Sequence, residues 1–167
     1  MFAQTLEGKP LVVLGCGSKK QSEPCPAIEL YTGSYFRAYR KWAESVGAEI
    51  YIFSAKHGVI HSSTVIEPYD VSFMFEEFRD EWVDLYTVRS QLENLRGNCT
   101  RGSLLTLAGE NYKRRLRIAG TGLFTDSVNP AAVLSKQKYR DSRNGYQRLI
   151  LAEYYGKQLP HVGENHV

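Results

Sequence analysis

Four side chains in the loop segments of this sequence have the chemistry needed to break a polar covalent bond: Lys20, His57, Glu67 and Asp70. A carboxylate from Glu67 or Asp70 can activate water as a general base or stabilise a cationic transition state. His57 titrates near neutral pH, and a nearby carboxylate would hold its orientation. We therefore predict a catalytic group in these loops. Metal binding by the histidine and the two acids is not predicted, because no standard ligand spacing is present.

The first polar segment, Gly-Cys-Gly-Ser-Lys-Lys at residues 15–20, directly follows the apolar run 11–14. Glycines let a backbone approach a ligand closely and lysines supply charge, which suits a phosphate or a carboxylate. The spacing is neither that of a P-loop nor that of a dinucleotide fingerprint. The alternative is a tight turn with solvated lysines and an inert thiol. The predicted ligand contacts are Gly15, Cys16, Gly17, Ser18 and Lys19.

Two further segments follow the second and third apolar runs, at residues 54–58 and 108–112. A helix that begins near Gly109 would present free N–H groups to an anion, and Tyr112 could stack on a base or pack in the core. Basic residues follow at once and could hold phosphates or be solvated. The predicted substrate contacts here are Tyr31, Ser54, Lys56, Tyr69, Gly109, Asn111 and Tyr112, and the predicted phosphate contacts are Lys113 and Arg114.

Positive charge is concentrated late in the chain. Between Glu110 and Lys157 there are ten basic residues and four acidic ones, whereas the whole chain has a net charge of only +3. This asymmetry indicates a polyanionic partner or a solvated basic face. Three residues in a stretch that interleaves cations with a tyrosine are predicted to contact a nucleic-acid backbone: Lys138, Arg140 and Arg143.

The elements that would position these loops alternate between strands and helices. Strands are predicted at 11–14, 50–53 and 103–107, and a short one is possible at 123–124. Helices are predicted at 34–46, 75–95, 110–118 and 146–155, the second with one continuous apolar stripe. This order predicts a three-layer α/β/α fold with a mainly parallel central sheet, in which ligands bind at the carboxyl ends of the strands.

Length and composition bound the class of protein. The 167 residues suit a single α/β domain with its core at about 10–156, and the 43% apolar content is that of a globular protein. We expect no membrane span, no signal peptide and no cofactor, and the sequence does not reveal the oligomeric state. Three cysteines form no disulfide framework, so a reducing cytoplasm is the expected compartment.

Several segments together resemble a set of small bacterial and phage proteins of poorly defined function. The shared motifs are GCGSKK, AIELYTGSYF (27–36), FSAKHG, VIEPYD and LAGENY, which together cover about residues 10–115. The portion FSAKHGVIHSSTVIEPYD is the most specific, and it also resembles a strand-loop segment of the YaaA peroxide-stress family.

The resemblance implies an α/β fold similar to that of uracil-DNA glycosylases and to domains attached to tRNA base-exchange enzymes. Members of this broad group bind nucleic acid, and some anti-phage members excise modified bases. The chain lacks two uracil-glycosylase motifs: GCGSKK stands where Gly-Gln-Asp-Pro-Tyr is expected, and no His-Pro-Ser follows the last strand.

The leading hypothesis is a DNA N-glycosylase that excises a modified base from foreign, for example phage, DNA. A loop carboxylate would stabilise the cationic sugar, and Lys20, Lys56 or His57 would neutralise the departing base; alternatively, a lysine would attack C1′. Two other hypotheses remain open: a non-catalytic DNA-binding stress protein of the YaaA type, and an N-glycosidase that acts on free nucleotides.

Overall fold

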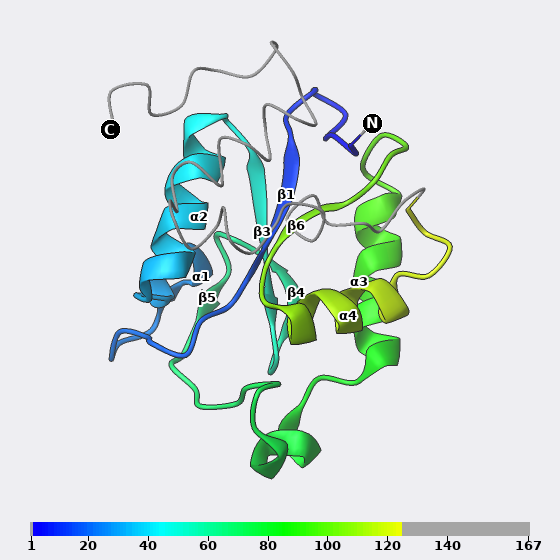
Figure 1. The fold of residues 1–167 in the computed structure, drawn as a ribbon. Coiled ribbons are helices and arrows are strands. Elements are labelled where there is room, and N and C mark those ends of the chain that lie inside the picture. Colours follow the sequence, from blue (N-terminus) through cyan, green and yellow to red (C-terminus); the bar gives the residue numbers. More distant parts are fainter. Residues whose placement is uncertain (1, 125–167) are drawn as a thin grey trace.

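The computed structural model describes residues 2–124. Its centre is a four-stranded sheet with the order β4-β3-β1-β6 (Figure 1). Strands β1 (Leu11–Gly15), β3 (Glu49–Ser54) and β6 (Leu105–Leu107) run parallel to one another. All three strands predicted within 11–107 are therefore confirmed. The short strand expected at 123–124 is wrong, because these residues form a turn in which the Leu123 N–H donates to the Gly120 carbonyl at 3.0 Å. The predictions at 125–167, among them the helix at 146–155 and the contacts Lys138, Arg140 and Arg143, lie outside the described residues.

The sequence analysis missed strand β4 (Gly58–His61), which pairs antiparallel with β3 through a tight turn. Gly58 lies at φ +76°, a backbone conformation that other residues rarely adopt. A second, two-stranded sheet joins β2 (Cys25–Pro26) to β5 (Val65–Ile66) and packs beside the short helix α1 (Ala27–Leu30). These small elements carry two of the predicted site residues, Tyr31 and Tyr69, toward the main sheet.

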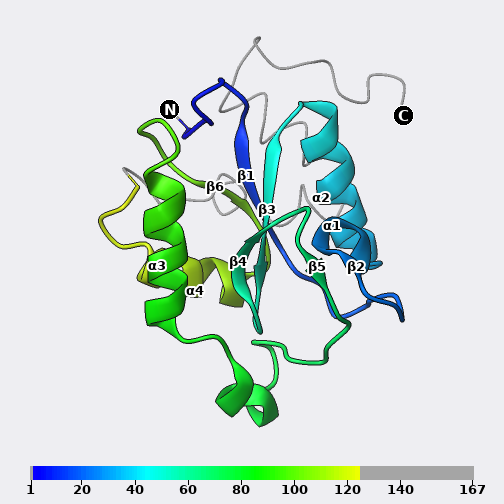
Figure 2. The same ribbon diagram turned by 180° about the vertical axis from the view of Figure 1, so that it is seen from behind.

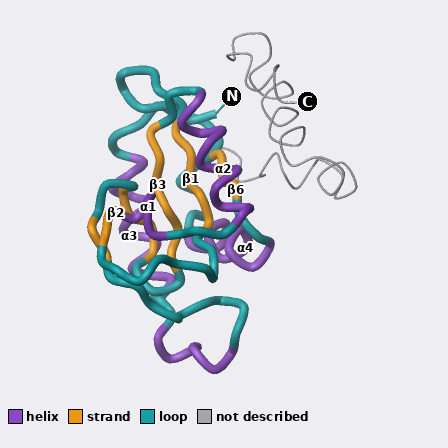
Figure 3. Tube along the Cα trace, turned by 90° about the vertical axis from the view of Figure 1, so that its left-hand side faces the viewer, coloured by secondary structure: helices purple, strands orange, loops and turns teal. Residues whose placement is uncertain are grey.

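Helices cover both faces of the main sheet. Helix α2 (Ser34–Ser45) lies on one face, and α3 (Leu85–Arg96) and α4 (Glu110–Ala119) lie on the other, as Figures 1 and 2 show from opposite sides. In the view of Figure 3, α2 lies in front of the strands and α4 behind them. The α/β class with a mostly parallel, helix-flanked sheet is thus established. Residues 11–14 of β1 are all buried, as expected of a central parallel strand.

The single helix predicted at 75–95 is wrong. A 3₁₀ helix, η1 (Glu76–Glu81), ends at the extended residue Trp82, and α3 begins only at Leu85. The physical reason is Asp84, whose carboxylate accepts a hydrogen bond from the Thr87 N–H at 2.8 Å and so caps a new helix. Phe75 is 53% exposed, so the predicted apolar stripe is not one continuous packed face.

Candidate functional site

The carboxyl ends of β1, β3 and β6 bring the three predicted polar segments to one edge of the sheet. The backbone N–H of Cys16 donates to the Phe53 carbonyl at 3.1 Å, which links the first segment to the end of β3. The Cys16 thiol lies 3.4 Å from the Tyr112 hydroxyl, which links the first segment to α4. The expected convergence of these loops is therefore present.

Packing explains the glycine that ends β1. A Cβ at Gly15 would lie 2.5 Å from the Cβ of Ala108, closer than any real contact of that kind, so β1 and β6 meet there only because the side chain is absent. Gly17 differs, since a Cβ there would meet nothing within 4 Å. Close strand packing accounts for the first glycine, and the predicted backbone approach to a ligand applies better to Gly17.

A group of three buried hydroxyls lies under this edge. The Tyr69 hydroxyl is 2.5 Å from that of Tyr31 and 2.6 Å from Ser54 Oγ. Ser54 Oγ also accepts hydrogen bonds from the backbone N–H groups of Lys56 and His57, each at 3.1 Å. The end of β3, the end of α1 and the loop after β5 are thus joined by one hydrogen-bond network. Burial raises the pKa of both tyrosines, so they stay neutral donors.

Cations surround the ring of Tyr69. Lys20 Nζ lies 4.5 Å from the centroid of that ring and 5.8 Å from the centroid of the Tyr31 ring, distances typical of cation–π contacts. Lys56 Nζ lies 5.9 Å from the Tyr69 centroid, and the His57 ring stands edge-on to it at 5.4 Å. The structure therefore places Lys20, Lys56 and His57 around one aromatic ring.

Burial lowers the pKa of Lys20, although the charges of Cys16 and Asp70 oppose that change. Burial and the neighbouring charge of Lys56 also lower the pKa of His57. Both shifts favour the uncharged forms, which can share a lone pair. Titratable groups with perturbed pKa values, grouped at the carboxyl ends of parallel strands, are typical of a functional site.

The two predicted carboxylates differ in their surroundings. Asp70 is exposed, yet it follows Tyr69 directly and its charge acts on Lys20. Glu67 is exposed and has no such electrostatic effect on Lys20. Its charge and its place next to Tyr69 therefore associate Asp70 with the cluster more closely than Glu67. Ser18 and Lys19 are exposed at the rim, and the Ser18 carbonyl accepts a hydrogen bond from Lys20 Nζ at 3.3 Å.

The third segment forms the start of α4, with Gly109 as its N-cap. Tyr112 is only 6% exposed and its ring packs 4.9 Å from that of Phe73, so the core alternative for this residue describes its environment. The side-chain N–H of Asn111 donates to the Met74 sulfur at 3.1 Å, and the side-chain oxygen of Asn111 accepts from the exposed Arg114.

Lys113 is buried and ion-paired at the start of α4. It is only 6% exposed, and its ammonium lies 2.7 Å from a carboxylate oxygen of Glu110. The solvated alternative for Lys113 is therefore wrong, and a phosphate bound by Lys113 would have to compete with Glu110.

A family model of a family of unknown function, DUF6884, matches residues 11–141. The chain belongs to this family. The matched range includes all the loops that form the edge described above, from Gly15 to Tyr112. A search of curated proteins finds none that matches.

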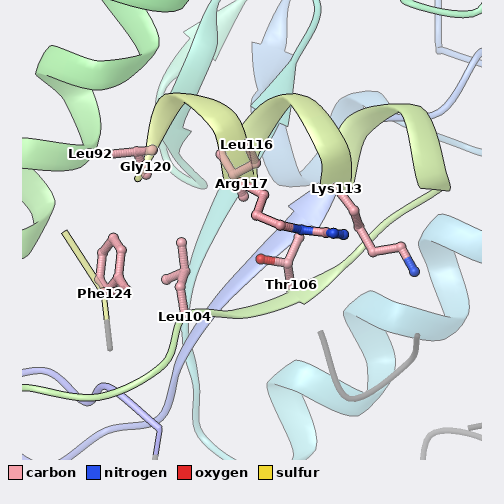
Figure 4. Close-up of a pocket in the computed structure, with 8 residues that line it drawn as sticks. All are labelled: Leu92, Leu104, Thr106, Lys113, Leu116, Arg117, Gly120 and Phe124. Carbon is pink, nitrogen blue, oxygen red and sulfur yellow. The ribbon is translucent and has the colours of Figure 1, made fainter. Parts of the chain in front are cut away.

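This DUF6884 member also has a pocket lined by residues of α3, β6 and α4 (Figure 4). Leu92, Leu104, Leu116 and Phe124 form its apolar part, and Thr106, Lys113 and Arg117 supply polar atoms. Within residues 2–124 there is no group of three or more histidines, cysteines or acids placed to hold a metal ion. No helix in the same range is long and apolar enough to cross a membrane.

Sequence reasoning missed one part of the molecule near this edge: Arg115, Phe73 and Trp82. Arg115 stacks on both aromatic rings, at 4.6 Å and 4.3 Å from their centroids. A basic run gives no signal of this kind, because the contact depends on how the loop 71–84 folds over α4.

Proposed function

We propose that the protein is a DNA N-glycosylase that excises a modified base. The observation that supports this best is the position of Lys20, a half-buried lysine stacked on Tyr69 at the carboxyl edge of the sheet and within the field of Asp70. An enzyme that cleaves an N-glycosidic bond needs opposite charges at the two ends of that bond, and this pair supplies them.

In the first route, water attacks C1′ while the bond to the base breaks. The sugar becomes cationic in the transition state, and the Asp70 carboxylate stabilises it and accepts the proton of the attacking water. The bonding electron pair leaves with the base, which takes a proton from the Lys20 ammonium. The products are a free base and an abasic sugar.

In the second route, Lys20 acts as the nucleophile. Its lowered pKa increases the fraction of neutral amine, which attacks C1′ as the base departs with the electron pair and takes up the amine proton. The C1′–O4′ bond of the sugar then opens to leave an imine, which water hydrolyses. Both routes give the same base and differ in whether a covalent intermediate forms.

The surrounding residues support selectivity for a base. His57, with its lowered pKa, has in its neutral form one N–H donor and one lone-pair acceptor for the edge of an extruded base. The hydrogen bonds of Ser54 and Tyr31 hold the Tyr69 ring in a fixed position beneath Lys20. This rigidity favours catalysis, because a reacting amine must be held in place.

The test is an abasic-site assay. Labelled oligonucleotides and phage DNA with modified pyrimidines are incubated with the full-length protein and treated with hot alkali, which breaks strands at abasic sites. Lys20→Met and Asp70→Asn are expected to lower the rate at least about 100-fold. Matched changes at exposed positions, Lys41→Met on α2 and Asp80→Asn on η1, are expected to leave the rate unchanged.

Borohydride trapping separates the two routes. Borohydride traps an imine, so a protein–DNA adduct that is absent in Lys20→Met identifies the second route. Loss of activity in Glu67→Gln with retention in Asp70→Asn would transfer the carboxylate role to Glu67.

An absence of strand breaks in every modified DNA would refute the glycosylase. Salt-sensitive retention of DNA without breaks would then favour a binding protein, and base release from nucleoside monophosphates alone would favour a nucleotide N-glycosidase.

A further inference from the structure

Arg115 on α4 has its charged group fixed by aromatic rings. The guanidinium carbon lies 4.3 Å from the centroid of the Trp82 ring and 4.6 Å from that of the Phe73 ring. Among residues 2–124, no acidic side chain lies within ion-pair distance of this guanidinium. Stacking on rings uses the faces of a guanidinium, whereas its N–H groups point outward in the plane.

Two other arginines act on the charge of Arg115. The pKa of Arg115 is lowered first by burial and then by the charges of Arg114 and Arg79, while Glu76 opposes these effects. Glu76 accepts two hydrogen bonds from Arg79, at 2.7 Å and 3.0 Å, so the negative charge of Glu76 is already paired with that arginine. Arg114 and Arg79 therefore both repel Arg115, while the carboxylate of Glu76 acts on both Arg79 and Arg115 and that of Asp80 acts on Arg79. An anion at this point would relieve the repulsion among the arginines.

The position of this arginine relates it to the candidate site. Arg115 follows Tyr112 by almost one helical turn, and the Phe73 ring contacts both residues. Tyr112 in turn contacts Cys16 at the end of β1. A chain of three direct contacts thus leads from Arg115 to the first polar segment.

We propose that Arg115 binds a backbone phosphate of the DNA strand whose base enters the candidate site. The identity of the strand rests on the proposed function, whereas the phosphate chemistry rests on the arginine itself. A guanidinium presents parallel N–H groups that fit two phosphate oxygens, and a fixed guanidinium loses little freedom on binding. The exposed Arg114, next to Arg115 in the chain, adds positive charge, so the site favours a phosphate diester within a polyanion over an isolated weak anion.

The experiment measures binding of an unmodified duplex oligonucleotide to the full chain as a function of salt concentration. Each phosphate contact makes the slope of log K against log salt more negative by about 0.9, so the slope for Arg115→Gln is expected to be less steep by about 1. Arg115→Lys keeps the charge but loses the planar fork, and it is expected to keep the slope while binding more weakly. The matched control is Arg101→Gln, an exposed arginine in the turn before β6.

Thermal melting of each variant shows whether it folds, and Arg115→Lys remains informative if Arg115→Gln does not. Equal slopes for Arg115→Gln and Arg101→Gln would overturn the proposal. Loss of deoxycytidine monophosphate binding in Arg115→Gln, without measurable DNA binding by the wild type, would also overturn it and would assign the phosphate to a free nucleotide. Because unmodified DNA is used, a change in slope supports the phosphate site even if the abasic-site assay gives no product.

Discussion

The Tyr69 hydroxyl lies 2.6 Å from Ser54 Oγ, and this hydrogen bond joins the loop after β5 to the last residue of β3. Both residues are buried, at 8% and 0% exposure. Tyr69 also carries the ring on which Lys20 stacks. The stability of the loop and the position of the proposed catalytic amine therefore depend on the same side chain.

Replacement of Tyr69 by phenylalanine is expected to destabilise the fold by about 1–3 kcal/mol. The variant keeps the ring but removes the hydroxyl, and the buried hydroxyl of Tyr31 loses a partner. Urea unfolding measures the change in free energy. Tyr86→Phe, at a side chain that is 86% exposed, should change it little. An equal stability of the two variants would contradict the role given to this network.

Replacement of Gly58 by alanine is expected to destabilise the β3–β4 turn. The new Cβ would lie 2.1 Å from Gln91 Oε1, and that side chain cannot move away freely because it accepts from the Val59 N–H and donates to the His57 carbonyl. The positive φ of Gly58 adds strain, so the total cost is about 2–4 kcal/mol.

Gly47→Ala separates the two causes, because φ is +69° at Gly47 and a Cβ there would meet nothing within 4 Å. Chemical denaturation should show a smaller loss for Gly47→Ala than for Gly58→Ala. If the two losses are equal, backbone strain alone explains the effect and the contact with Gln91 contributes nothing.

Arg40→Met is expected to cost about 1 kcal/mol, more than an ordinary surface ion pair. The Arg40 guanidinium makes two hydrogen bonds to Glu29, at 2.6 Å and 3.0 Å, and reaches the Ile28 carbonyl at 3.1 Å. It therefore fixes α1, from whose end Tyr31 projects, against α2. Thermal unfolding checks this against Arg79→Met, whose ion pair lies within one turn of η1. A larger shift for Arg79→Met would contradict the proposed anchoring.

The sequence was sufficient to predict the parallel strands and the loops at their carboxyl ends. Short uninterrupted apolar runs such as 11–14, followed by glycine and polar residues, are typical of buried parallel strands. It was not sufficient for the segment 75–84, where apolar residues at helical spacing continue across a break. Periodicity predicts burial on one face, but the cap at Asp84 and the extended residue Trp82 decide where a helix begins.

The candidate site was predictable in its residue types but not in its contacts. The positions of Lys20, His57 and Tyr69 at strand ends were visible as polar residues after apolar runs. Their arrangement around one ring was not, because it depends on the small β2–β5 sheet, whose strands have only two residues each. In the sequence Arg115 is one of several consecutive basic residues, and its stacking on Phe73 and Trp82 is a long-range contact that such a run does not indicate.

Lys20→Met is expected to raise the free energy of unfolding at pH 7. Burial lowers the pKa of Lys20 in the folded protein, whereas the unfolded chain keeps the ordinary value of 10.5. Between the lowered pKa and 10.5, the folded protein therefore binds fewer protons than the unfolded chain. Stability therefore increases with pH through that window, and the penalty for the buried charge is complete only below the lowered pKa. Methionine carries no charge, so the advantage of the variant should shrink as the pH rises toward 10.5.

Urea unfolding across the alkaline range measures this difference, with Lys41→Met reporting the effect of losing an exposed lysine. A variant less stable than the wild type at pH 7 would show that the stacking of Lys20 on Tyr69 outweighs its desolvation; a more stable but inactive variant would show that Lys20 is kept for function at a cost in stability.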